Sequence, residues 1–192
     1  MKKLLAALVI PACAGCFTAH VPTVSEWNVV PDVATVRTAK TPAYGVARLS
    51  QVVVCAPYDE RGMLVFRDDN TVTSDSYNLF AAVPSRLLRE PARSVLQASG
   101  KFSAVVGATS SANVSHVIEL TVTDLRLDCS HDETHPDRRE AVAEVFALVL
   151  DQNRDIVASA RGTARSDARD GNYGTAFSAA FSAALEDALR GF

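Results

Sequence analysis

The stretch that decides the fold is Val117-Ile118-Glu119-Leu120-Thr121-Val122-Thr123-Asp124-Leu125-Arg126-Leu127. Apolar residues alternate with polar ones through Ile118, Leu120 and Val122, and the phase then changes to Leu125 and Leu127. Alternation with a period of two indicates a strand, and a bulge adds the one residue that such a phase change needs. The stretch therefore predicts a long, central strand with a bulge near Thr123 and Asp124.

The chain that follows predicts a hairpin and then a helix. Residues 141–150 are apolar on both alternating faces, residues 152–155 make a polar turn, and residues 156–164 return as a second strand. Apolar residues then recur at helical spacing over residues 172–190, which predicts an amphipathic helix that lies on the sheet.

The chain before the central strand predicts a meander of short strands. Val52–Val54 is a β-branched run, which favours a strand buried on both faces. Asp59–Gly62 makes a polar turn into a second short strand over Met63–Arg67, and a further polar turn at Asp68–Asn70 leads into an extended stretch at Thr71–Thr73.

A second helix is predicted from Pro84 to Gly100, and Pro91 is expected to kink or restart it. The predicted fold class is α/β. We expect a single domain over residues 41–192, with a mixed β-sheet packed by two main helices.

The first residues predict export and lipidation. Two lysines, an apolar run at residues 4–12 and small residues stand before Cys16, as in an export signal. The apolar run is too short to cross a hydrocarbon layer of ~30 Å. The pattern resembles a bacterial lipobox, in which the chain is cut after residue 15 and Cys16 is acylated. Cys13 is a competing site, and an ordinary secretory leader is the alternative.

Residues 16–40 are interpreted as the lipidated N-terminus and a tether, since they lack clear periodicity. Packing of Trp27–Val30 on the domain as an edge segment is an equal alternative. Phe17 stands where an Asp would resemble an inner-membrane retention signal, so we expect the periplasmic face of the outer membrane.

The charge balance argues against nucleic acid as a partner. Removal of residues 1–15 takes away two of the 19 basic residues and none of the 22 acidic ones, so the net charge changes from −3 to −5.

One segment carries a resemblance to a known family: Ala56-Pro57-Tyr58-Asp59-Glu60-Arg61-Gly62-Met63-Leu64-Val65-Phe66-Arg67. It resembles the signature of the ABC-type transport auxiliary lipoprotein component family, which includes paraquat-inducible protein C. The resemblance continues, in order, through Tyr77, Phe80, Ala81, Ala82, Pro84, Leu96, Ser99, Gly100, Lys101, Phe102 and Val105.

This resemblance implies an outer-membrane lipoprotein that works with an MCE-type transporter in moving lipids between the two membranes. The implied partner is a periplasmic MCE-domain protein, and a homo-oligomer is also considered. No cofactor and no enzyme activity are expected. The alternatives are an adaptor for another envelope machine, such as peptidoglycan synthesis or secretion, and an envelope hydrolase.

The signature residues Tyr58, Arg61 and Arg67 have two interpretations. Tyr58 can bury its ring, and Arg61 or Arg67 can pair with Asp59 or Glu60, which is turn architecture. The other interpretation is direct contact with a partner. Turn motifs commonly persist for backbone reasons, so we favour the architectural role.

Cysteine and histidine chemistry gives two further hypotheses. After lipidation Cys55 and Cys129 are the remaining pair, so an exported chain predicts a disulfide between them; two buried reduced thiols are the alternative. The loop at residues 129–137 contains a thiol, His131 and His135, but its pattern is that of a hairpin loop, and we expect no metal.

Overall fold

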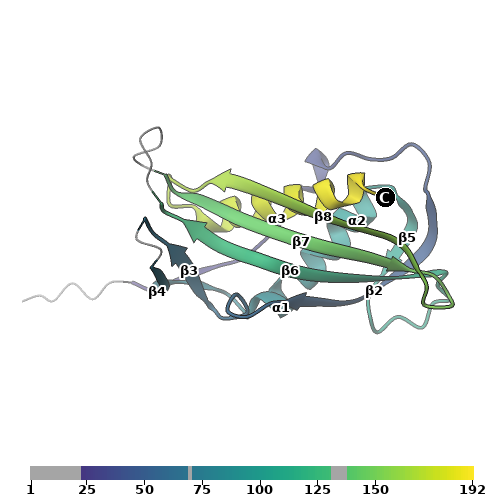
Figure 1. Ribbon diagram of the computed structural model, residues 1–192, viewed down its shortest axis with the longest axis horizontal. Coiled ribbons are helices and arrows are strands. Elements are labelled where there is room, and N and C mark those ends of the chain that lie inside the picture. The colour runs from purple at the N-terminus through teal and green to yellow at the C-terminus, as the bar shows by residue number, and fades with distance from the viewer. Residues whose placement is uncertain (1–22, 69–70, 131–137) are drawn as a thin grey trace, which may run out of the picture.

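The computed structural model describes residues 23–68, 71–130 and 138–192, and it confirms the predicted mixed α/β domain (Figure 1). Eight strands form one sheet, and the helices lie against it. The elements in chain order are β1 (Ser25–Trp27), the 3-10 turn η1 (Val33–Thr35), β2 (Tyr44–Val54), β3 (Gly62–Phe66), β4 (Val72–Phe80), α1 (Pro84–Leu87), α2 (Arg89–Ala98), β5 (Phe102–Val106), β6 (His116–Asp128), β7 (Glu140–Leu150), β8 (Ile156–Asp167) and α3 (Tyr173–Arg190).

Strand β6 is the centre of the sheet, as its length predicted. Strand β7 pairs with one edge of β6 in the antiparallel sense, and β8 continues this hairpin. Parallel β2 and then parallel β3 share the other edge, because β2 pairs with the first half of β6 and β3 only with Leu127 and Asp128. Beyond them lie β5, next to β2, and the β4–β1 pair, next to β3.

The predicted bulge in β6 is confirmed. The register with β7 shifts between Val122 and Asp124, so that Thr123 is the extra residue. If β6 ran through these residues without a bulge, Leu125 and Leu127 would point to the face opposite Val122, because side chains alternate along a strand. With the bulge, one buried face of β6 carries Ile118, Leu120, Val122, Leu125 and Leu127.

The helices pack on that same face of the sheet (Figure 1). Helix α3 lies on β7 and β8, and the Asn172 side chain caps it by accepting a hydrogen bond from the Thr175 N–H, 3.2 Å away. The predicted restart before Pro91 is also present, because α1 ends at Leu87 and α2 begins at Arg89. A proline ring clashes with the carbonyl four residues earlier, which here is that of Leu87.

The segment before β2 is part of the folded domain, and the domain therefore begins earlier than residue 41. Strand β1 pairs with β4, and the Trp27 Nε1–H donates to Asn78 Oδ1 at 3.0 Å. Val29 and Val36 are buried, and the Val30 N–H donates to Ser178 Oγ at 2.8 Å. Of the two interpretations of this segment, packing on the domain is the one that the structure shows for residues 25–36.

The opposite face of the sheet has no described helix on it, and we call it the open face. It carries the side chains between the core positions of β6, β7 and β8, among them Arg126, Glu144, Phe146 and Arg161. This arrangement corrects the expectation that Val52–Val54 is buried on both faces. Val53 is 40% exposed, since β2 has helices on one face only.

Candidate functional site

The signature turn holds the fold together through two side chains. Asp59 Oδ1 accepts a hydrogen bond from the Ser85 N–H at 2.7 Å, so a distant loop caps the first turn of α1. The Arg61 Nε–H donates to the Phe80 carbonyl at 2.9 Å, and its Nη2 forms an ion pair with Glu26 of β1. These contacts give Asp59 and Arg61 architectural roles, although Arg61 pairs with Glu26 and not with Asp59 or Glu60 as the sequence suggested.

Tyr58 belongs to a polar cluster below the same turn. Its hydroxyl lies near the side chains of Asp124 and Arg126, which form an ion pair with each other. Burial raises the pKa of Tyr58, and the neighbouring Asp124 raises it further. Burial likewise raises the pKa of Asp124 against the effect of Arg126. The Arg126 guanidinium also lies 4.5 Å above the centre of the Phe66 ring.

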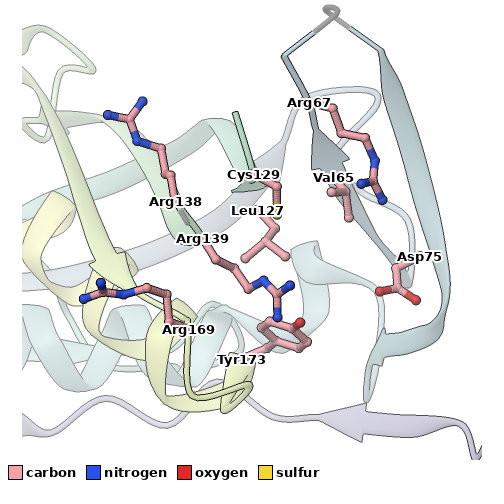
Figure 2. Close-up of a pocket in the computed structure, with 9 residues that line it drawn as sticks. All are labelled: Val65, Arg67, Asp75, Leu127, Cys129, Arg138, Arg139, Arg169 and Tyr173. Atoms are coloured by element: carbon pink, nitrogen blue, oxygen red, sulfur yellow. The ribbon is translucent and has the colours of Figure 1, made fainter. Parts of the chain in front are cut away.

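Arg67, the third signature residue, lines a cavity at the end of the sheet (Figure 2). The cavity is open to solvent, has a volume of about 530 Å³, and lies between the β3–β4 pair, the end of β6 and the start of α3. Its apolar floor is Val65 and Leu127, both buried. The polar lining residues are Arg67, Asp75, Cys129, Arg138, Arg139, Arg169 and Tyr173.

Two of the four arginines take part in ion pairs at the edge of the cavity. Arg169 Nη2 lies 2.5 Å from Asp167, and Arg138 Nε lies 3.7 Å from Glu140. In Figure 2 the guanidinium groups of Arg138 and Arg169 extend to the side away from Asp75. Arg139 reaches toward Tyr173, and Arg67 lies beside Val65. The cavity therefore has one arginine at either side of its floor.

Asp75 is the acidic group of the cavity, and its oxygens are bound to its own strand. Oδ1 accepts from the N–H groups of Tyr77 at 2.8 Å and Asn78 at 3.0 Å, and Oδ2 accepts from the Asn78 side chain. Burial opposes ionisation, but these hydrogen bonds outweigh it and lower the pKa of Asp75. Asp75 is therefore a charged, structurally occupied carboxylate.

The predicted Cys55–Cys129 disulfide is wrong: both thiols are free, and both are half-buried, whereas the alternative expected them to be buried. The Cys55 N–H donates to the Val122 carbonyl, whereas Cys129 lies beyond the end of β6. Val122, beside Cys55, is seven residues of extended chain from Cys129, which corresponds to about 20 Å. A disulfide needs Cα atoms within about 7 Å. Burial raises the pKa of the Cys129 thiol, against the effect of Arg139.

The histidines of the 129–137 loop, His131 and His135, lie outside the described residues. Within the described ranges no group of three or more His, Cys, Asp or Glu side chains is placed to hold a metal ion. No helix in the described part of the chain is long and apolar enough to cross a membrane.

An ion-pair network crosses the open face. Asp128 accepts from Arg165 at 2.8 Å and from the Ser130 hydroxyl and N–H, and Arg165 also reaches Glu140 at 3.2 Å. Burial opposes ionisation, but the hydrogen bonds from Ser130 and Arg165 lower the pKa of Asp128 to about 2.

The lowered pKa of Asp128 predicts a pH-dependent contribution to stability. A depressed pKa stabilises the fold above the unfolded value near 4, and this stabilisation is lost as the pH falls toward about 2. Arg165 is 45% exposed, so solvent screening reduces the contribution to about 1 kcal/mol. We expect urea unfolding to show Asp128→Asn less stable by about this amount at pH 7, with the difference vanishing near pH 2. Asp187→Asn, at an exposed single ion pair, is the control, and an equal deficit there would contradict the assignment.

Comparison with known proteins finds solved structures with a similar fold. No family model and no curated protein sequence matches the chain. The crystal structure of a Xanthomonas campestris protein of the family DUF330 is similar with a TM-score of 0.65 and 17% identity, covering 88% of this chain and 93% of that one. A crystal structure described as an uncharacterized protein matches with a TM-score of 0.53 and 14% identity over 76% and 80% of the two chains. These similarities show the fold.

A further similar structure is the PelC dodecamer from Paraburkholderia phytofirmans, with a TM-score of 0.45 and 20% identity over 80% of this chain and 98% of that one. For this chain, the homo-oligomer stays a prediction.

Proposed function

We propose that the protein is a lipoprotein adaptor, anchored through Cys16 to the periplasmic face of the outer membrane, that docks an MCE-type transport assembly and performs no chemistry itself. The observation that supports this proposal is the ordered resemblance from Pro57 to Arg67 and from Phe80 to Phe102. In the structure this signature builds the junction between β1, β3, β4 and α1, through the contacts of Asp59 and Arg61.

Docking is expected to use the open face. Its strands present both apolar and charged side chains, including Phe146 on β7 and Arg161 opposite it on β8, and no described helix covers them. Interfaces of this mixed kind gain affinity from packing at their centre and selectivity from charges at their rim.

The test is co-purification of partners from native membranes with the tagged, full-length lipoprotein, followed by mass spectrometry. We expect an MCE-domain protein to be recovered. Recovery of cell-wall synthases in its place would contradict the transport proposal and favour the alternative adaptor.

A matched pair of charge reversals tests the open face. Arg161 and Arg190 have similar exposed fractions, 60% and 58%, and each forms one ion pair, but Arg161 lies on the open face and Arg190 on α3. We expect Arg161→Glu to lower recovery of the MCE-domain protein severalfold and Arg190→Glu to leave it unchanged. Equal recovery with both variants would contradict docking through this face.

A further inference from the structure

We propose that the cavity at the end of the sheet binds a phosphate ester, with the oxyanion held between the guanidinium groups of Arg67 and Arg139. The ester's apolar substituent would lie on the floor formed by Val65 and Leu127. This proposal does not depend on the adaptor function.

The first argument is the approach of the two arginines. Arg67 comes from the end of β3 and Arg139 from the residue before β7, so the sheet holds them at opposite sides of one cavity. Figure 2 shows the two guanidinium groups on either side of the space next to Leu127. A guanidinium group binds phosphate through two parallel N–H donors, so a pair of them can enclose one oxyanion.

The second argument is charge. Among the described residues, no carboxylate oxygen lies within 4 Å of a side-chain nitrogen of Arg67 or Arg139, while Arg138 pairs with Glu140 and Arg169 with Asp167. Asp75 is a charged carboxylate in the same cavity and interacts with Arg67, but its oxygens accept hydrogen bonds from Tyr77 and Asn78, and the two arginines together exceed it by one positive charge. The Cys129 thiol stays neutral, because burial raises its pKa. Positive charge is thus available in a chain whose net charge is −3.

The third argument concerns the class of anion. Helix α3 starts at Tyr173 in the cavity wall, and the positive end of an 18-residue helix favours a negative ligand there. The tyrosine hydroxyl is a further hydrogen-bond donor. The floor of Val65 and Leu127 offers contact to carbon atoms, which inorganic phosphate lacks. A phosphate ester offers an oxyanion to the two arginines and carbon atoms to the apolar floor. This holds whether the ester comes from a lipid headgroup or from a soluble metabolite.

The chain contains its own probe for this site. Trp27 is the single tryptophan, and its ring lies edge-on to Tyr173 with centroids 5.7 Å apart. Ligand binding beside Tyr173 is therefore expected to change Trp27 fluorescence. The titration uses the full-length protein in detergent with three probes: dihexanoyl phosphatidic acid, glycerol 3-phosphate and inorganic phosphate.

We expect both esters to bind, each at least tenfold tighter than inorganic phosphate. Tighter binding of the phosphatidic acid than of glycerol 3-phosphate would assign the ester to a lipid, and equal affinities to a soluble source. Inorganic phosphate binding as tightly as both esters would overturn the role of the floor and with it the ester assignment.

The arginines are tested with a control from the same rim. Arg67→Gln and Arg139→Gln should each weaken ester binding at least tenfold, whereas Arg169→Gln should change it less than threefold because that side chain pairs with Asp167. Thermal unfolding establishes that each variant is folded, and a variant that is not folded is replaced by Arg67→Lys or Arg139→Lys, which keep the charge but lose the paired donors. Unchanged binding in the Arg67 and Arg139 variants, or an equal loss in Arg169→Gln, would overturn the proposal.

Discussion

Gly162→Ala is expected to lower the free energy of unfolding by about 3 kcal/mol, the upper range for overpacking a closed site. Gly162 lies on β8 where α3 crosses the strand, and an added Cβ would overlap the Ala184 carbonyl oxygen and the Ala188 amide nitrogen. Both are backbone atoms of a helix, so neither can move aside by changing a rotamer. The strand and the helix would have to separate, and the alanines and Leu185 that α3 buries would lose contact with the sheet.

Gly107→Ala is the matched control for this prediction. It is the same substitution in the same chain, but the added Cβ meets no atom within 4 Å. We expect its unfolding free energy in urea to lie within about 0.5 kcal/mol of the parent or slightly above it, because alanine restricts the unfolded chain. Equal stability of the two variants would show that α3 and β8 do not approach each other as described.

Periodicity in the sequence predicted the parts of the fold in which one surface is buried. The bulged β6, the β7–β8 hairpin and α3 all have apolar residues in a fixed period, and a shift of one residue would expose them. Strand β1 had no such signal, because three residues cannot show a period and its pairing with β4 spans about fifty residues of chain. The exposure of Val53 was missed because a β-branched run does not reveal that helices cover only one face.

The cavity could not be predicted from the sequence, since its residues become neighbours only in the folded sheet. Arg67 was selected as part of the signature, but Asp75, Arg139 and Tyr173 come from three other parts of the chain. The disulfide prediction failed for a related reason. Each cysteine follows a strand, but β2 ends beside Val122 while parallel β6 continues to Asp128, so the two strand ends are far apart.

Cys16→Ala is expected to abolish acylation and, with it, stable retention on the outer membrane. The short apolar run and the small residues before Cys16 are typical of a site that becomes the acylated first residue of the mature chain. One acyl chain binds a membrane only marginally, whereas several chains anchor a protein stably.

The decisive measurement is incorporation of labelled palmitate, because an uncut leader would itself hold the chain at the inner membrane and confuse a simple fractionation. We expect full-length wild-type protein to be labelled and to sediment with outer membranes. Cys13→Ala, three residues away in the same leader, is the control and should keep both the label and the location. The Cys16→Ala protein should carry no label and should be absent from the outer-membrane fraction. If the label persisted in Cys16→Ala and disappeared in Cys13→Ala, the anchor would be Cys13, and the mature chain would begin three residues earlier than we propose.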